Sequence, residues 1–207
     1  MLVAILLFHR VTALDAVGPY EVLQRVPGAE VVFTAARPGP QATDGTLSLV
    51  AATPLEDVPA ADVLVVPGGF GTRPLVRDEP LLAWIRQVHA TTTWTASVCT
   101  GSLLLAAAGL LDGCEAATHW RAVGELEALG ARPVGRRVVD SADRIVTAAG
   151  VSSGIDMALV LAARLAGDDV ARSIQLAIEY DPEPPFDAGS PDKAGPAIVE
   201  LAGGRPR

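Results

Sequence analysis

The sequence predicts an α/β protein with a mostly parallel central sheet. Apolar runs of strand length alternate with segments of helical periodicity, an order typical of parallel strands covered by helices. Of the 207 residues, 50% are hydrophobic, whereas aromatic residues supply only 4%. Val, Leu, Ile and Ala must therefore fill the core, as they do in sheets with both faces covered.

The alternation begins at the N-terminus. Residues 2–8 are apolar, lack a basic start and end at His9 and Arg10, after too few residues to span a bilayer. They predict a buried first strand rather than a signal or membrane segment. The next expected elements are a helix at 14–25, strands at 30–35 and 62–66, a helix at 80–90, a strand at 93–98 and a helix at 103–109.

The second half of the chain continues the pattern without a repeat or linker. The expected elements are a strand at 116–119, a helix at 122–129, strands at 137–139 and 145–147 with a hairpin turn at 141–143, and helices at 154–166 and 169–180. We therefore expect a single domain over residues 1–207. Residues 181–191 are too rich in proline and glycine for a helix, so 181–207 should form a tail that wraps the surface or a partner subunit.

Charge and cysteine content exclude several classes of protein. The net charge of -8 and the absence of any Lys/Arg run argue against a nucleic-acid partner. Two cysteines in a chain this long do not form a disulfide framework, and no Cys/His spacing is typical of a metal site. A reducing, cytoplasmic location fits best, with a structural role for Cys114.

Cys99 lies where an apolar strand meets the small-residue turn Thr100-Gly101-Ser102, directly before a helical segment. This order is typical of a nucleophile elbow, in which the nucleophile lies at a strained corner beside the free N–H groups of the next helix. Those surroundings favour the reactive thiolate. The alternative is that Cys99 fills the core, because unpaired cysteines are often buried.

A glycine loop, Pro67-Gly68-Gly69-Phe70-Gly71, follows the strand one unit before the elbow. Glycine allows backbone N–H groups to approach a ligand. The N–H groups of Gly69 and Thr100 are therefore a candidate oxyanion hole for a substrate attacked by Cys99. The alternative is that the loop is an ordinary tight turn. The spacing of its glycines does not match the fingerprint of a dinucleotide-binding site.

Other candidates follow strands, where open parallel sheets bind ligands. Asp15 opens the first helical segment and either caps it or moves protons at the edge occupied by Cys99. His119 is either a general base or a hydrogen-bonded structural residue. The segment from Gly150 to Ser153 also falls at this edge, although Ser152 and Ser153 resemble a helix cap.

Together, the elbow cysteine, the Pro-Gly-Gly loop, the Leu-Asp-x-x-Gly-Pro-x-Glu opening and Thr-His-Trp resemble the ThiJ/PfpI superfamily of class I glutamine-amidotransferase-like domains. Asp15, Cys99, Thr100 and the tail from Glu179 are most similar to its isonitrile hydratase branch. The resemblance covers nearly the whole chain. It implies a flavodoxin-like three-layer sandwich, usually a homodimer, with no metal or organic cofactor.

The resemblance also implies site roles: Cys99 as nucleophile, Asp15 as the early acid, and Gly69 and Thr100 as oxyanion donors. Gly68 and Gly150 are the further candidates for substrate binding. The protease-like branch carries histidine after the cysteine, so Thr100 argues against peptidase activity.

The expected reaction adds water to an isonitrile through a Cys99 thioimidate and yields an N-substituted formamide. Asp15 transfers the protons and Thr100 orients the water or the nitrogen. One alternative is glyoxalase- or deglycase-type chemistry on small 2-oxoaldehydes, which requires proton transfer by His119. Another is a non-catalytic ligand- or redox-sensing domain, although related regulators carry a basic helix-turn-helix domain after this module.

Overall fold

The computed structural model describes residues 1–203 and contains a central seven-stranded sheet. Its strands, from one edge to the other, are β10 (Val138–Ala142), β11 (Ile145–Ala148), β7 (Trp94–Val98), β6 (Val63–Val66), β1 (Leu2–Leu6), β2 (Glu30–Ala35) and β5 (Thr53–Pro54). All neighbouring pairs are parallel except β10 with β11. The predicted mostly parallel sheet is confirmed.

Burial explains why the central strands form. All four residues of β6 and of β11 are buried, as are four of the five residues of β1. Continuous aliphatic runs suit strands whose two faces are both covered by helices. In the register of the sheet, Ala4 of β1 lies between Val32 of β2 and Leu64 of β6.

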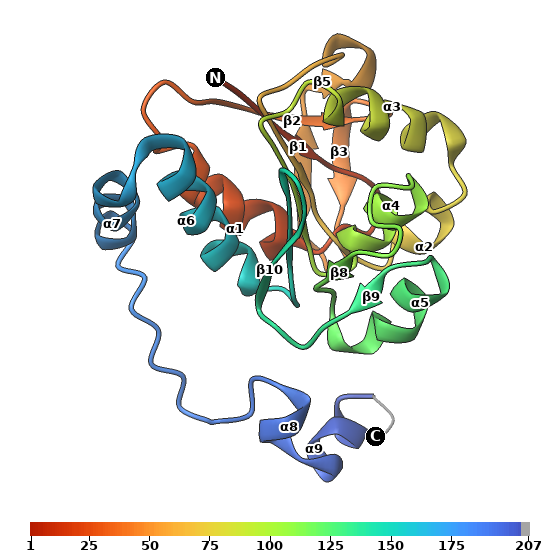
Figure 1. Ribbon diagram of the computed structural model, residues 1–207, viewed down its shortest axis with the longest axis vertical. Coiled ribbons are helices and arrows are strands. Elements are labelled where there is room, and N and C mark those ends of the chain that lie inside the picture. The colour runs from red at the N-terminus through yellow and green to blue at the C-terminus, as the bar shows by residue number, and fades with distance from the viewer. Residues whose placement is uncertain (204–207) are drawn as a thin grey trace.

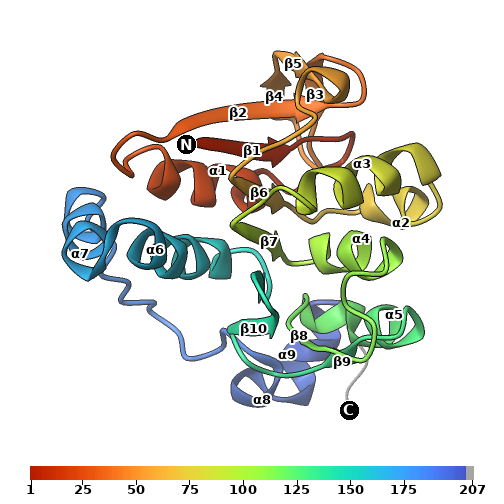
Figure 2. The same cartoon turned by 45° about the horizontal axis from the view of Figure 1, so that its top comes forward.

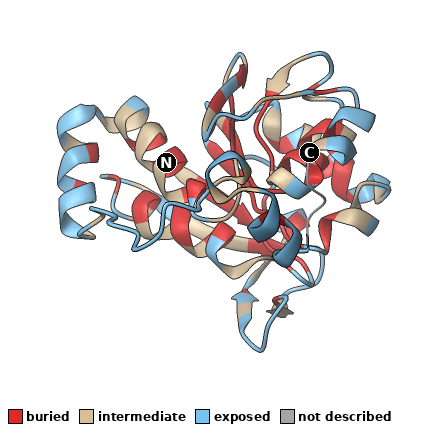
Figure 3. Cartoon of the chain, turned by 90° about the horizontal axis from the view of Figure 1, so that it is seen from below, coloured by how far each residue is buried: buried red, intermediate tan, exposed pale blue. Residues whose placement is uncertain are grey.

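Helices cover both faces of the sheet. Figure 2 shows α1 (Ala13–Leu23) and α6 (Ser153–Ala166) on one side of the strands, with α3 (Glu79–His89) and α4 (Gly101–Ala107) on the other. The helix α7 (Asp168–Ala177) packs on α6, while α2 (Thr72–Leu75) and α5 (Val123–Ala128) pack on α4. Figure 3 shows the buried strands between helices whose outer faces are exposed. This is the three-layer sandwich that the sequence predicted.

The segment before His119 differs from the expected strand at 116–119. Only β8 (Glu115–Ala116) is extended there, and it pairs with β9 (Arg132–Pro133) in a separate two-stranded sheet. The next amide, that of Ala117, donates to Thr147 Oγ1 at 2.7 Å, so a side chain takes the place of a ladder partner. His119 therefore reaches the site from a loop that precedes the 3-10 turn η2 (Trp120–Ala122).

A second two-stranded sheet was not predicted. It is the hairpin of β3 (Gly39–Ala42) and β4 (Ser48–Ala51), after which β5 leads into the 3-10 turn η1 (Leu55–Asp57). Gly39 and Pro40 within β3 disfavour a strand by local propensity. Leu47 and Val50 remain 53% and 60% exposed, so the usual burial signal is also missing.

The tail is only partly as expected. Residues 181–190 contain no helix, but α8 (Pro191–Ala194) and α9 (Pro196–Leu201) follow. Each begins with a proline, which fits the first turn of a helix because its missing N–H has no partner there. Figure 1 shows the tail leaving α7 and ending at these two short helices. The side chain of Val199 in α9 is buried, and Arg121 Nη1 donates to Ala202 O at 3.4 Å, so the tail contacts its own chain.

Within residues 1–203, none of the helices combines the length and the apolar character needed to cross a membrane.

Candidate active site

Cys99 lies at the sharp corner between β7 and α4. Its φ is +58°, in the left-handed region that non-glycine residues rarely adopt. The surrounding chain holds this conformation: Cys99 N–H donates to Ala148 O and Ala149 O, both at 3.0 Å. Its carbonyl accepts from Ser102 Oγ at 3.1 Å and from Thr118 Oγ1 at 3.2 Å. The corner has the strained geometry of the nucleophile elbow that the sequence predicted.

Asp15 extends from the first turn of α1 toward Cys99 and is completely buried. Its Oδ2 accepts the Gly68 N–H at 3.0 Å, whereas Oδ1 has no hydrogen-bond partner of standard geometry among residues 1–203. Burial raises the pKa of Asp15 to about 7, although the Gly68 N–H and the Cys99 side chain act to lower it. A buried carboxyl group of this kind exchanges its proton near neutral pH.

The resting state of Cys99 differs from the thiolate that we expected. Burial, followed by the negative charge of Asp15, raises the pKa of the Cys99 thiol to about 12. The N–H groups of Val151 and Thr100 at the sulfur lower this pKa, but by less than burial and Asp15 raise it. Desolvation disfavours the charged form more than these donors stabilise it. At neutral pH Cys99 is a thiol beside a carboxyl group that can accept its proton.

The glycine loop is arranged differently from the expected oxyanion hole. The Gly69 N–H donates to Thr100 Oγ1 at 2.9 Å, and Thr100 Oγ1 donates back to Gly69 O at 3.1 Å. Gly69 has a φ of +137°, and a Cβ there would lie 2.2 Å from Arg10 O, so only glycine fits. The Gly69 amide is thus already bonded within the protein, and Thr100 links the elbow to the loop.

Val151 contacts the reacting sulfur through its backbone, which the sequence does not indicate. Together with the Thr100 N–H, its backbone N–H approaches the Cys99 sulfur, and its φ of +33° is unusual for a β-branched residue. The sequence places the segment from Gly150 to Ser153 after a strand. A contact made by a backbone N–H group does not depend on the side chain, so the position after β11 is the only feature of the sequence that indicates it.

A pocket of ≈ 380 Å³ opens above the elbow. It brings together Cys99, Thr100, His119 and Gly69 of the predicted residues, and its remaining lining is Thr12, Asp44, Phe70, Arg73, Arg121, Glu125 and Val151. Asp15 and Gly68 do not line it. A pocket of this size is at the small end of those that bind organic ligands.

His119 lines the pocket, whereas the predicted residue Gly150 does not line it but lies against the His119 ring. A Cβ on Gly150 would lie 2.8 Å from His119 Cδ2, so glycine there leaves room for the imidazole. His119 Nδ1 accepts the Arg121 N–H at 3.3 Å. Burial, together with the positive charges of Arg121 and Arg73, lowers the pKa of His119, which keeps the ring neutral.

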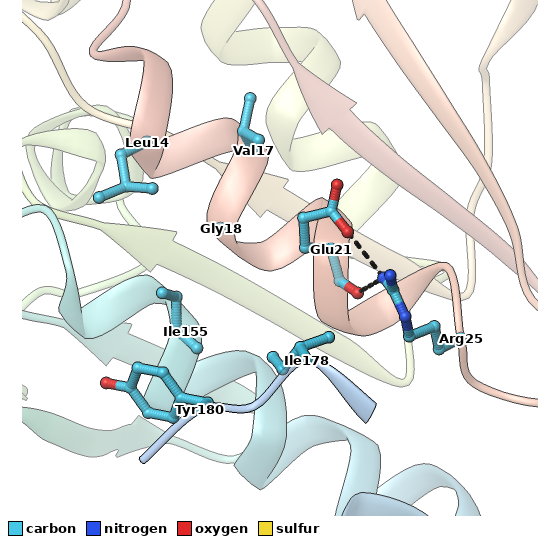
Figure 4. Close-up of a pocket in the computed structure, with 8 residues that line it drawn as sticks. All are labelled: Leu14, Val17, Gly18, Glu21, Arg25, Ile155, Ile178 and Tyr180. Atoms are coloured by element: carbon cyan, nitrogen blue, oxygen red, sulfur yellow. Dashed lines mark hydrogen bonds and ion pairs between the residues drawn. The ribbon is translucent and has the colours of Figure 1, made fainter. Parts of the chain in front are cut away.

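Figure 4 shows a second pocket of ≈ 380 Å³ between α1, α6 and the segment after α7. Its lining is mostly apolar and includes Leu14, Val17, Ile155 and Ile178. Its acid, Glu21, is paired with Arg25 at 2.7 Å. No cysteine, serine or histidine lines it, so the nucleophilic chemistry belongs to the Cys99 pocket.

Residues 1–203 contain no group of three or more His, Cys, Asp or Glu side chains arranged to hold a metal ion.

Comparison with known proteins places these features in a family. The family model described as "DJ-1/PfpI family" matches residues 1–164. The chain is 46% identical over 200 residues to isonitrile hydratase from Pseudomonas putida, covering 97% of this chain and 87% of that protein. It is also 30% identical over 182 residues to the HTH-type transcriptional regulator GbdR from Pseudomonas aeruginosa, but spans only 48% of that protein.

Solved structures agree with this assignment. A ThiJ/PfpI family protein from Pseudomonas syringae has a TM-score of 0.91 at 36% identity, covering 98% of this chain and 86% of that chain. Oxidized DJ-1 from Toxoplasma gondii has a TM-score of 0.76 at 25% identity, covering 87% of this chain and 99% of that chain. This chain is therefore a member of the DJ-1/PfpI (ThiJ/PfpI) family.

Proposed function

We propose that this protein is an isonitrile hydratase, an enzyme that adds water to R–N≡C and releases the formamide R–NH–CHO. The observation that carries the proposal is the buried Asp15 carboxyl group beside the Cys99 thiol, below a small pocket. The isonitrile hydratase of Pseudomonas putida, 46% identical over 97% of this chain, supports the same reaction.

The first half of the reaction forms a covalent intermediate. Ionised Asp15 accepts the proton of the Cys99 thiol while the sulfur attacks the terminal isonitrile carbon. Asp15 then delivers that proton to the same carbon, so one S–C bond and one C–H bond form and the product is the thioimidate Cys99–S–CH=N–R. A pKa of about 7 suits a group that both accepts and donates the proton.

The second half hydrolyses the thioimidate. Asp15, ionised again, takes one proton of the water as the oxygen adds to the carbon and passes that proton to the nitrogen, which gives the intermediate Cys99–S–CH(OH)–NH–R. The C–S bond then breaks as the carbonyl forms, the hydroxyl proton passes to the sulfur through Asp15, and the formamide leaves. The Thr100 and Val151 N–H groups stabilise the sulfur as it gains negative charge, both during attack and during expulsion.

Thr100 supports the site through its position. Because its hydroxyl is bonded to both the N–H and the carbonyl of Gly69, it keeps the loop that carries Gly68 against Asp15. His119 has no step in this scheme. Its neutral ring lines the pocket that contains the reacting sulfur, and Gly150 leaves room for that ring.

The test is incubation of the purified protein with a panel of alkyl and aryl isonitriles, with formamide measured by chromatography. We expect turnover by the wild-type protein and none by Cys99→Ala. Asp15→Asn should lower kcat by about 100- to 10,000-fold, the usual contribution of general acid–base catalysis. Cys114→Ala is the matched control and should retain activity, because Cys114 is the other free cysteine and does not line the pocket. Full activity of folded Cys99→Ala would refute the proposal.

Methylglyoxal belongs in the same panel. Lactate from methylglyoxal without formamide from any isonitrile would favour the 2-oxoaldehyde alternative. A redox sensor based on a reactive thiolate is disfavoured by the raised pKa of Cys99, since the thiolate is the form that peroxide oxidises.

We also propose that the chain acts as one domain with a tail at 181–207, in the cytoplasm and as a homodimer that binds small molecules rather than nucleic acid. The two free cysteines and the net charge of -8 support the location and the ligand class. The family resemblance supports the dimer, and light scattering measures its mass.

A further inference from the structure

The charged side chains that line the Cys99 pocket differ in whether they form an ion pair. Asp44 pairs with Arg10 at 3.1 Å, and Arg73 pairs with Glu125 at 2.9 Å. Arg121, the remaining charged side chain of the lining, has no carboxylate partner among residues 1–203. Among residues 1–203, Arg121 is therefore the charged side chain of this lining that has no oppositely charged partner.

The tail helps to position this guanidinium group. Arg121 Nη1 donates to Ala202 O at 3.4 Å, directly after α9, and a Cβ on Gly203 would lie 3.6 Å from Arg121 Nη2. The guanidinium carbon also lies 6.0 Å from the centre of the Trp120 ring. These contacts use few of its five N–H donors, so a planar anion can still bind.

The surroundings of Arg121 suit an anion for a second reason. Arg121 and Arg73 line the pocket together with His119, and both act on that ring as positive charges. The neutral His119 ring and Phe70 contribute uncharged surface to the same pocket. A ligand with a reactive apolar end and an acidic end matches this distribution.

We propose that the substrates of this site are isonitriles that carry a carboxylate, which Arg121 binds while the isonitrile carbon faces Cys99. The inference rests on the proposed hydratase function and names its substrate class. Arg121 is then a specificity residue, since a bidentate guanidinium–carboxylate contact recognises the acid and contributes nothing to the chemistry at the carbon.

The experiment compares a series of ω-isocyanoalkanoates of increasing chain length with their methyl esters. The wild-type protein should show a higher kcat/KM for the acid than for the ester at the chain length that spans the pocket. In Arg121→Gln the acid-to-ester ratio should fall about tenfold or more, the usual loss for a hydrogen bond to a charged group, mainly through the KM of the acid. High salt should weaken the wild-type preference.

Arg172→Gln is the matched control. Arg172 lies on α7, is paired with Asp169 at 3.3 Å and does not line the pocket. This variant should keep the wild-type ratio, and thermal melts should show that both variants fold. An acid-to-ester ratio that Arg121→Gln leaves unchanged would overturn the inference, even though hydration of the esters would still support the proposed function.

A binding experiment tests the carboxylate site separately from the hydratase function if no isonitrile is turned over. N-formylglycine and its methyl ester are titrated calorimetrically into the wild-type protein and Arg121→Gln. Tighter binding of the acid that is lost in Arg121→Gln would support the carboxylate site although the hydratase function had failed. Equal binding of the two compounds would reject the carboxylate site.

Discussion

Thr100 has a different role at the residue scale from the one that its place after the cysteine suggests. The sequence indicates a residue that orients water or substrate, but its hydroxyl is fully engaged with the Gly69 backbone. The buried hydroxyl is the acceptor for the Gly69 N–H, whereas the Gly69 carbonyl also accepts from Thr72 Oγ1 at 2.9 Å. Its contribution is therefore to hold the elbow and the glycine loop together.

We predict that Thr100→Val lowers the free energy of unfolding by about 1–3 kcal/mol, because the Gly69 N–H loses its acceptor in a dry environment, whereas the Gly69 carbonyl keeps its hydrogen bond from Thr72 Oγ1. Thr100→Ser keeps the hydroxyl and should restore most of the stability and activity. Urea denaturation measures the first effect and formamide production the second. Equal stability of the valine and serine variants would contradict this role.

At the element scale, the close approach of α4 to β6 determines the elbow. Gly101 is the first residue of α4, and a Cβ there would lie 2.0 Å from Val66 O at the end of β6. The added Cβ would belong to α4 and the Val66 oxygen belongs to β6, so the clash cannot be relieved without displacing the helix or the strand. Glycine at this position allows the elbow to pack over the neighbouring strand.

We predict that Gly101→Ala destabilises the fold by about 3 kcal/mol or more and abolishes activity, since overpacking at the backbone displaces Cys99. Gly124→Ala provides the control. Gly124 also lies in a helix, α5, but a Cβ there meets nothing within 4 Å. That substitution should stabilise by up to about 1 kcal/mol through helix propensity. Thermal unfolding of both variants checks the contrast, and comparable melting temperatures would refute it.

The pH dependence of stability is a property of the whole molecule that depends on one buried group. The pKa of Asp15 rises from 3.8 to about 7 on burial, so the folded state holds a proton that the unfolded chain releases. The contribution of this proton to the free energy of unfolding is complete below pH 3.8, the ordinary pKa of the carboxyl group, and is lost as pH rises through about 7. The rise of the Asp15 pKa from 3.8 to about 7 corresponds to at most about 4 kcal/mol.

We predict that Asp15→Asn, which cannot ionise, removes this loss. The difference in free energy of unfolding between the variant and the wild type should shift in favour of the variant from about pH 4 to about pH 8. Urea denaturation of both proteins at a series of pH values measures this difference. The contributions of the other carboxyl groups that titrate in this range are common to both proteins and cancel when the two free energies are subtracted. A pH-independent difference would show that Asp15 keeps an ordinary pKa in the folded protein.

Much of the architecture follows from local pattern. The aliphatic run of residues 2–8 and the strand before Cys99 predicted buried strands, and Gly101 after the cysteine predicted the turn into a helix. The hairpin β3–β4 and the helices α8 and α9 were not predicted, because their glycine, proline and exposed apolar residues resemble loop sequence.

The sequence by itself determined the parallel sheet, the elbow cysteine and the edge at which Asp15, Gly68 and Cys99 meet. It did so because local periodicity sets the strands and parallel strands bring their carboxyl ends together. Only the tertiary structure decided the thiol form of Cys99, the engagement of the Gly69 amide by Thr100 and the position of Arg121, which has no carboxylate partner among residues 1–203. Desolvation and hydrogen-bond pairing depend on segments distant in the chain, so they are settled only when those segments pack.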